Sequence, residues 1–525
     1  MSATDSLQPL WNGFQYFPHQ VEGIHWMLHK EIEGTLVDAR KTSEPPVLVR
    51  GGFQCDDMGL GKTIQIVATM THHPLPLTVL LAPLAMIDTW TQVCQRAGLS
   101  VFHAVGGEWF PVSSSSSSSV YITNFEKVYT TPRLFRHLVI DRVVLDEAHK
   151  IRNPDGQMAI YARRLGSKNN PIRWAVTGTP LVNSWKDVVS LLAFIGVPYS
   201  PLWKWEQRYI DILPDLVLHR SLDSLRSLLP SAPPLPVIHH LSLPFHSSLE
   251  KEFYLAIQNS VIVQATGSST SMDTITPQQA FLLLLRLRQL SVHPQLYISA
   301  KRRQSPNYIR KDWTGPSTKL LAIRDILLTD LSHSLLQQQQ QQEKEEQEKG
   351  EQEKEKEKEK EEEKEESKEP HRYLIFCQFN EEMDIIREYL LSLGFFTELD
   401  ILLYHGGLTL LEREDVLRSS KLSVRPTVML LQLQAGGVGL NLQEYDRIIF
   451  VSPWWTSALM DQAVARAVRM GQTRTVHVYH LQLDIEAQES VVLIDSLVYG
   501  KAEEKRAMLE EFFRISQHHH DHDRH

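Results

Sequence analysis

Short apolar runs alternate with amphipathic helical patterns along most of this chain. In its first part, apolar runs at 77–83, 142–149 and 173–180 end in polar or turn-forming residues, and a helical pattern covers 84–98. The alternation begins again at residue 372, with further apolar runs at 427–437, 446–455 and 475–481. Strands that alternate with helices predict parallel sheets covered by helices. Because the pattern occurs twice, we predict an α/β fold with two lobes.

Three low-complexity segments interrupt this pattern: seven serines at 113–119, a Gln-, Glu- and Lys-rich stretch at 337–370, and a His-rich tail. The second of these has no apolar residue with which to form a core. Residues 181–300 have mostly helical patterns and contain a proline-rich break. We therefore expect a tail at 1–13, a first lobe at 14–235, a helical extension and connection at 236–316, a second lobe at 317–515 with the 337–370 insert, and a tail at 516–525.

Composition narrows the class of protein. Cys55, Cys94 and Cys377 are the only cysteines, too few for a disulfide framework or a four-thiolate zinc site. No apolar run is long enough for a bilayer, and the first residues lack the regions of a signal peptide. We expect a soluble intracellular protein without a membrane partner. The insert carries 15 Glu and 8 Lys of a chain whose net charge is −9, so charge neither favours nor excludes nucleic acid.

The stretch CDDMGLGKT at 55–63 raises the first question about chemistry. It ends like a phosphate-binding loop, G-x-x-x-x-G-K-[ST], but Asp56 stands where the first glycine is usual. An apolar run precedes it and a helical pattern follows. In the order strand, loop and helix, backbone N–H groups at the helix start face a phosphate. The alternative is a loop with a surface lysine.

Two later motifs favour the nucleotide interpretation. Asp146 and Glu147 follow an apolar run, where a Mg²⁺-nucleotide enzyme needs one carboxylate for the metal and another for water. The segment 175–180 (AVTGTP) is a simple turn by itself, but in this order it fits a sensor loop. On a predicted helix over 461–474, Gln462, Arg466 and Arg469 share one face, which suits a phosphate clamp better than a solvated basic face.

Eleven blocks in order now identify a resemblance that covers about residues 14 to 515. They are FPHQVEGIHWML, DDMGLGKT, LLAPLAMIDTW, YITNFE, DEAHKIRN, TGTPLVNS, LRLRQLSVHPQLY, LIFCQF, AGGVGLNL, PWW and DQAVARAVRMGQT. The chain resembles the SWI/SNF-related DNA-dependent ATPases of helicase superfamily 2. The resemblance implies two RecA-like lobes with a helical insertion after the first lobe, ATP and Mg²⁺ as cofactors, and translocation along duplex DNA. It also implies a nuclear location and chromatin or repair proteins that select the substrate.

The same resemblance implies a role for each matching residue, with Asp56 expected at the first-glycine position. Lys62 would hold the β- and γ-phosphates, Thr63 and Asp146 would hold Mg²⁺, Glu147 would be the general base, and Arg469 the arginine finger beside Arg466. Gln20 would read the adenine. The remaining nucleotide contacts would come from Asp57, Met58, Gly59, Leu60, Gly61, Gly437, Gly439 and Gln462.

Four positions depart from the family pattern. Gln432 and Gln434 replace a hydroxyl residue and a lysine associated with the grip on DNA, Ser452 replaces an aspartate, and Val468 replaces a histidine. No catalytic group is lost. A degenerate motor that binds DNA as a scaffold stays open as the alternative, and an RNA helicase as a third. We expect the 337–370 insert to be a dispensable surface loop of the second lobe.

Overall fold

The computed structural model describes residues 7–38, 45–113, 116–229, 232–266, 276–330, 370–423, 425–433, 440–485 and 491–517. The chain forms two compact units. One unit consists of residues 1–232, 456–458 and 503–525, and the other of residues 233–455 and 459–502. Helix α18 (Ile494–Gln517) contributes its first residues to the second unit and the rest to the first.

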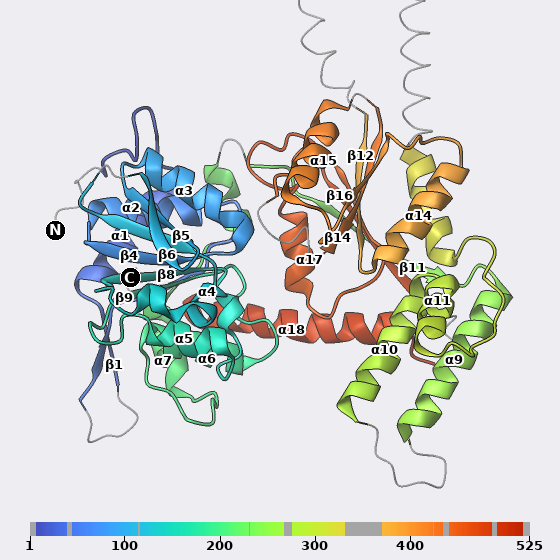
Figure 1. Ribbon diagram of the computed structural model, residues 1–525, viewed down its shortest axis with the longest axis horizontal. Helices are drawn as coiled ribbons and strands as arrows, with labels where there is room; N and C mark the ends of the chain where they lie inside the picture. Colours follow the sequence, from blue (N-terminus) through green and yellow to red (C-terminus); the bar gives the residue numbers. More distant parts are fainter. Residues whose placement is uncertain are drawn as a thin grey trace, which may run out of the picture. The chain divides into compact units, whose positions relative to one another are not determined.

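The first unit is built on an eight-stranded sheet with the order β10-β3-β9-β8-β4-β7-β5-β6 (Figure 1). Its pairs are parallel, apart from the antiparallel pair of β5 and β6. The strands are β3 (Gly51–Gln54), β4 (Leu77–Leu81), β5 (Ser100–Val105), β6 (Glu108–Ser113), β7 (Ser119–Thr123), β8 (Arg142–Asp146), β9 (Ile172–Val176) and β10 (Val217–Leu218). A separate two-stranded sheet pairs β1 (Thr35–Val37) with β2 (Val47–Val49).

Helices cover both faces of this sheet. One face packs against α1 (Pro18–Ile32), α2 (Lys62–His72) and α3 (Ile87–Arg96), and the other against α5 (Gln157–Arg164), α6 (Trp185–Ile195) and α7 (Arg208–Leu216) (Figure 1). Along β4, Val79 and Leu81 lie in one core and Leu80 in the other. The apolar runs are continuous because both faces are buried. Shorter helices are α4 (Lys127–Thr130) and α8 (Leu222–Leu225), with 3-10 turns at Leu84–Met86, Pro132–Phe135, Ala148–Ile151 and Arg226–Leu228.

The second unit has a six-stranded parallel sheet with the order β11-β16-β15-β12-β14-β13. Its strands are β11 (Val237–Pro244), β12 (Arg372–Cys377), β13 (Ile401–Tyr404), β14 (Thr427–Gln432), β15 (Arg447–Phe450) and β16 (His477–Asp484). Helices α14 (Asn380–Ser392) and α17 (Ser457–Val464) pack in different cores on the two faces. This unit also contains α9 (Ser248–Thr266), α10 (Pro277–Val292), α11 (Pro294–Gln304) and α15 (Leu410–Leu422), and residues 318–330 are helical as well.

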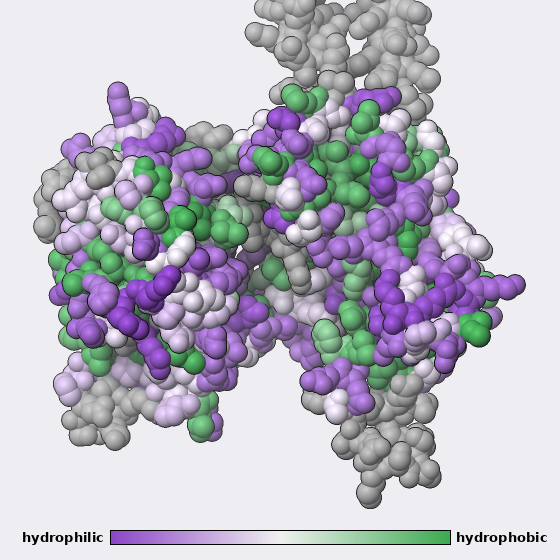
Figure 2. All heavy atoms as spheres, in the orientation of Figure 1, coloured by the Kyte–Doolittle hydropathy of each residue, from purple (hydrophilic) through white to green (hydrophobic). Residues whose placement is uncertain are grey.

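The fold class predicted from the sequence is confirmed by these two parallel sheets flanked by helices. On the face drawn in Figure 2, hydrophilic residues cover most of the surface and hydrophobic ones form scattered patches. Within the described residues, no helix combines the length and the apolar character that crossing a membrane requires.

Candidate nucleotide-binding and hydrolysis site

The loop at 55–61 connects β3 to α2, in the order that the sequence predicts for a phosphate-binding loop. Gly59 and Gly61 have φ angles of +88° and +81°, in the left-handed region that strongly favours glycine. Gly61 immediately precedes the helix, so the first N–H groups of α2 lack partners in the preceding turn. Such a helix start attracts an anionic group.

Lys62 begins α2 and turns its ammonium group back toward the loop. Nζ donates hydrogen bonds to the carbonyl oxygens of Asp56, at 2.7 Å, and Asp57, at 3.2 Å. Gly178 of the predicted sensor loop lies beside it, because a β-carbon at Gly178 would be 3.8 Å from Nζ. Two motifs separated by more than a hundred residues therefore meet at the lysine.

Asp56 is fully buried and has several partners. Its carboxylate accepts hydrogen bonds from Gln54 at 2.8 Å, from Gln65 at 3.0 Å, and from two nitrogens of Arg220 at 2.5 and 3.0 Å. Burial by itself would raise the pKa of Asp56. The hydrogen bonds and the positive charge of Arg220, together with the hydrogen bonds of Gln65 and Gln54, hold this pKa below its usual value. The carboxylate is thus a structural anion of the loop.

The first turn of α1 contacts the end of the same loop. Gln20 accepts a hydrogen bond from the N–H of Phe17 at 3.1 Å, and its amide nitrogen lies 3.4 Å from the carbonyl oxygen of Leu60. His19 reaches the same carbonyl at 3.0 Å. A β-carbon at Gly61 would lie 2.4 Å from the Gln20 amide nitrogen, so a larger residue there would displace the end of the Gln20 side chain. The structure brings Gln20 to the loop, with both ends of its amide engaged.

The other residues proposed for the loop differ in exposure. Leu60 buries its side chain in a small cluster with Leu225 and Leu229, so only its backbone is available to a ligand. Asp57, Met58 and Thr63 are partly buried, and Gly59 is exposed.

Asp146 lies at the end of β8, where burial raises its pKa first, and the neighbouring charge of Glu147 raises it further, to about 6. Three groups oppose this shift: the indole N–H of Trp90, which donates to the carboxylate at 2.8 Å, the positive charge of Lys62, and the backbone N–H of Glu147, which donates at 3.1 Å. A buried, partly repelled carboxylate gains from a nearby cation. Asp146 and Thr63 supply the hard oxygen donors that Mg²⁺ prefers.

No group of three or more His, Cys, Asp or Glu that could hold a metal ion occurs in the ranges that the structure describes. A magnesium ion that keeps several waters and bridges to phosphate oxygens needs only one or two protein ligands. The residues present therefore fit Mg²⁺ that arrives with a nucleotide.

Glu147 has a left-handed backbone, with φ +53° and ψ +51°, which costs a residue with a β-carbon on the order of 1 kcal/mol or more. Its carboxylate lies 3.3 Å from Nδ1 of His149. The same nitrogen lies 3.2 Å from the hydroxyl of Thr177 and 3.5 Å from that of Thr179. The acidic motif and the predicted sensor loop are thereby joined through one imidazole.

The prediction that Gln462, Arg466 and Arg469 share one helix is wrong. Helix α17 ends at Val464, and both arginines lie in the turns that follow it. The hydrogen bonds change there: the N–H of Arg466 bonds to Ala463 three residues back, and its carbonyl oxygen accepts from Leu442 at 3.1 Å. The buried Gln472 holds the turns, because its amide nitrogen donates to Gln443, Tyr445 and Ala467.

Burial in this segment separates Gln462 from the two arginines with which it was predicted to share a face. Gln462 is buried, like Ala463, Ala467 and Val468. Arg466 and Arg469 are partly buried, and burial lowers the pKa of Arg469. Gly437 and Gly439, like Gln434, lie outside the described residues, so nothing brings them to a site here.

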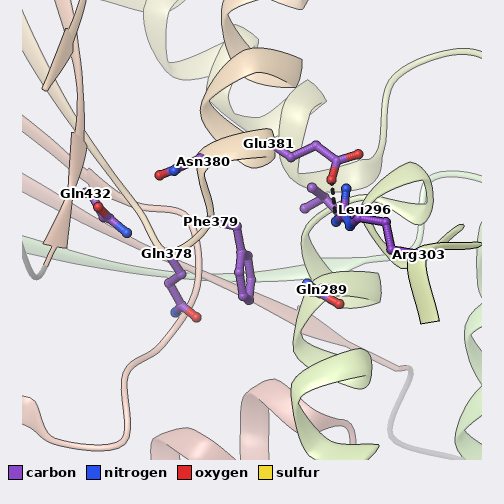
Figure 3. A pocket seen from close by; sticks show the side chains of 8 residues that line it. All are labelled: Gln289, Leu296, Arg303, Gln378, Phe379, Asn380, Glu381 and Gln432. Atoms are coloured by element: carbon purple, nitrogen blue, oxygen red, sulfur yellow. Dashed lines mark hydrogen bonds and ion pairs between the residues drawn. The ribbon is translucent and has the colours of Figure 1, made fainter. Parts of the chain in front are cut away.

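A pocket of about 400 Å³ lies in the second unit, at the carboxyl ends of β12 and β14 (Figure 3). Gln432 points toward it from β14, and Arg303 of α11 forms an ion pair with Glu381 of α14 at 2.9 Å. Its remaining lining residues are Gln289, Leu296, Gln378, Phe379 and Asn380. Four of its eight lining residues carry amides, and its one arginine is paired with Glu381.

Three residues of these sites were not predicted from the sequence. Trp90, Arg220 and Gln472 act through partners that are distant in sequence or through backbone carbonyls. Trp90 and Gln472 stand inside recognised blocks, so the blocks could have marked them as candidates without indicating their contacts.

Comparison with known proteins adds the family. Residues 19–296 match the model of the SNF2-related domain, and residues 355–471 match that of the helicase conserved C-terminal domain. The chain is 24% identical to DNA repair protein RAD5B of Arabidopsis thaliana, over 91% of this chain and 46% of that protein.

A second relative is the human SWI/SNF-related matrix-associated actin-dependent regulator of chromatin subfamily A member 1, 24% identical over 90% of this chain and 42% of that protein. The chain thus covers less than half the length of either relative. Among solved structures, the Sulfolobus solfataricus SWI2/SNF2 ATPase core in complex with dsDNA is similar, with 20% identity, a TM-score of 0.37, and coverage of 97% of this chain and 99% of that one.

Proposed function

The chain belongs to the family of the SNF2-related domain, whose members are generally DNA-dependent ATPases, and on this basis we propose that it hydrolyses ATP to move along duplex DNA. One observation carries the proposal. Lys62 bonds to the loop at the carbonyl oxygen of Asp56 and lies beside Gly178. Its positive charge also lowers the pKa of Asp146. Loop, acidic motif and sensor loop thus converge on one lysine, which is what a Mg²⁺-nucleotide site needs.

Each residue then has a proposed task. Lys62 and the loop from Asp57 to Thr63 bind the phosphates, and Gln20 reads the adenine after its amide leaves the Leu60 carbonyl. Asp146 and Thr63 hold Mg²⁺, which supplies positive charge at the phosphate oxygens. Glu147 accepts a proton from the attacking water, and His149 orients its carboxylate. Arg469 is proposed as the arginine finger, with Arg466 beside it and Gln462 near the γ-phosphate. Gly437 and Gly439 are proposed to contact the nucleotide or to help couple the lobes.

The domain organisation follows the same proposal. The first lobe is assigned to 14–235, the helical extension to 236–316 and the second lobe to 317–515, flanked by tails at 1–13 and 516–525. The pocket beside Gln432 is the proposed position of a DNA contact. The printed names of the relatives, a DNA repair protein and a chromatin regulator, support a nuclear role with chromatin or repair proteins that select the substrate.

The test is steady-state ATP hydrolysis without nucleic acid, with duplex DNA, with single-stranded DNA and with RNA. We expect the strongest stimulation with duplex DNA, and loss of hydrolysis in Lys62→Ala and in Glu147→Gln. Unfolding curves of both variants serve as the control for folding. Stimulation by RNA alone would assign the chain to another branch of the helicase superfamily.

A DNA-binding scaffold without turnover is the second candidate. The pocket beside Gln432 favours it, because the amide of Gln432 replaces the hydroxyl group typical of the family and the pocket's arginine is paired with Glu381. The same assay decides between the two. Hydrolysis no higher than in Lys62→Ala under every condition, together with retained DNA binding, would leave the scaffold role and contradict the motor.

A further inference from the structure

A segment outside the recognised nucleotide motifs runs along the start of the phosphate loop. Strand β10 pairs in parallel with β3, with Leu218 opposite Gln54. The pairing continues beyond both strands: the N–H of Cys55 donates to the carbonyl oxygen of Leu218 at 2.7 Å, and the N–H of Asp57 donates to that of Arg220 at 3.0 Å. The loop thus leaves the sheet while still bonded to residues 218–220.

Arg220 connects this segment to three parts of the site. Its guanidinium donates two hydrogen bonds to the buried carboxylate of Asp56, one to Gln65 of α2 at 2.9 Å, and one to the carbonyl oxygen of His19 in α1. The side chain of Asp56 is fully buried and that of Arg220 is 14% exposed. At so low an exposure, removing one partner leaves the other charge without compensation.

The next aspartate of the loop is held by the same segment. The N–H of Leu222 donates to the carboxylate of Asp57 at 2.9 Å, and Nε2 of His219 lies 3.6 Å from its other oxygen. Leu60 is buried against Leu225 and Leu229, which follow in the chain. Three of the loop's residues are therefore fixed from residues 219–229.

The end of helix α18 supports His219. The imidazole stacks on the ring of Phe513, with centroids 3.5 Å apart and planes at 10°. Gln517 lies 3.3 Å from the other ring nitrogen of His219. These contacts all lie within the first unit. Phe513 therefore limits the positions that His219, and hence the Asp57 side of the loop, can take.

We propose that Arg220 and His219 are positioning residues that hold the phosphate loop in its nucleotide-binding shape, with Phe513 of α18 as the support for His219. This inference rests on the proposed function, because it concerns the same loop. Ordering the loop before the nucleotide arrives lowers the entropy cost of binding. The backbone N–H groups after Gly59 then face the phosphates without a prior rearrangement.

The experiment measures MgADP binding to the full chain by isothermal titration calorimetry, and KM and kcat for ATP with saturating duplex DNA. We expect Arg220→Gln to weaken MgADP binding at least tenfold and to raise KM by a similar factor. We expect kcat to change less than threefold, because bound nucleotide reorders the loop. Arg220→Lys keeps the charge but loses the two-pronged geometry. Its affinity for MgADP should therefore fall between that of the natural chain and that of Arg220→Gln.

Arg226→Gln is the matched control, since Arg226 stands in the same segment and pairs with the exposed Asp223. It should bind MgADP as the natural chain does. Phe513→Leu, which leaves Arg220 intact, should weaken MgADP binding about threefold and provides the decision if Arg220→Gln does not fold. If Arg220→Gln and Phe513→Leu fold and bind MgADP within twofold of the natural chain, the inference is overturned. A natural chain that binds no MgADP would instead contradict the proposed function.

Discussion

At the scale of single residues, Asp56 shows why a motif can lose a glycine. Among residues with a positive φ, the loop contains only Gly59 and Gly61, so the backbone at Asp56 has no need of a glycine. The position instead carries a buried anion that joins Arg220, Gln54 and Gln65. The pattern G-x-x-x-x-G-K-[ST] therefore mixes positions fixed by backbone geometry with one that a different contact can replace.

We predict that restoring the usual glycine, Asp56→Gly, destabilises the protein. It removes the buried partner of Arg220, which costs roughly 3–5 kcal/mol of the free energy of unfolding. Asp223→Gly, at an exposed ion pair, should cost about 1 kcal/mol or less. Because folding lowers the pKa of Asp56, its contribution is present above about pH 4 and is lost as pH falls. Urea unfolding at pH 7.5 makes the comparison, and equal losses in both variants would contradict it.

Asp146 makes the opposite prediction for stability. Its folded pKa of about 6 lies above the ordinary value of 3.8 for an aspartate, so ionisation at pH 7.5 costs stability, at most about 3 kcal/mol. Asp146→Asn removes that charge and keeps an oxygen for the indole of Trp90. We expect the variant to unfold at a higher temperature at pH 7.5, by an amount that shrinks as pH falls toward 4, and to lose ATP hydrolysis. A variant less stable than the natural chain at pH 7.5 would show that burial does not oppose this charge.

At the scale of elements, the hydrophobic periodicity predicted the strands correctly but not the conformation of the segment that carries Arg466 and Arg469. The apolar runs at 77–83, 142–149 and 173–180 became β4, β8 and β9 because each is buried on both faces. The arginines after Val464 do not continue α17, because the carbonyl oxygens of Arg466 and Ala467 bond to Leu442 and Gln472 instead. A helical pattern records which side chains are apolar and contains no information about such tertiary hydrogen bonds.

The same limit explains which site residues escaped prediction. Lys62, Asp146 and Glu147 stand in local patterns with known chemistry, so their sequence positions suffice to nominate them. Arg220 acts on a carboxylate 164 residues away and Trp90 on one 56 residues away. The packing of α3 on the sheet and the pairing of β10 with β3 bring these residues to their carboxylates, and no local sequence pattern records either contact.

Helix α14 offers a prediction about DNA. Glu381 in its first turn pairs with Arg303, and Glu388 on the same helix is exposed. Glu381→Gln leaves the arginine available to a phosphate, so we expect tighter binding of duplex DNA at low salt and a slope of log K against log salt that steepens by about one. Glu388→Gln is the control, because it makes the same change of charge away from the pocket. Fluorescence anisotropy measures the binding of duplex DNA to both variants. Equal effects of both variants would assign the change to net charge and exclude the pocket as the contact.

At the scale of the whole molecule, Asp330 and Pro370, which flank residues 331–369 in the chain, both contact one cluster of charges. Asp330 pairs with Arg447 at 2.8 Å, and Arg447 follows Asp446 at the start of β15. Just after the segment, the carbonyl oxygen of Pro370 accepts a hydrogen bond from Arg474, which pairs with Asp446 at 2.5 Å. A short connection can therefore join the two ends without disturbing the second sheet.

We predict that replacing residues 337–369 by a Gly/Ser linker of about ten residues leaves the unfolding temperature and kcat unchanged. Loop-closure entropy varies only with the logarithm of loop length, by about 0.6 kcal/mol for each doubling. The exchange also removes a charge of −7 from a chain of −9, so association with duplex DNA should become faster at low salt and equal to that of the natural chain at high salt. A Gly/Ser replacement of the original length separates charge from length, because it should reproduce the faster association. Loss of ATP hydrolysis in both replacements would instead show that the Glu- and Lys-rich sequence has a task in the motor that its composition does not reveal.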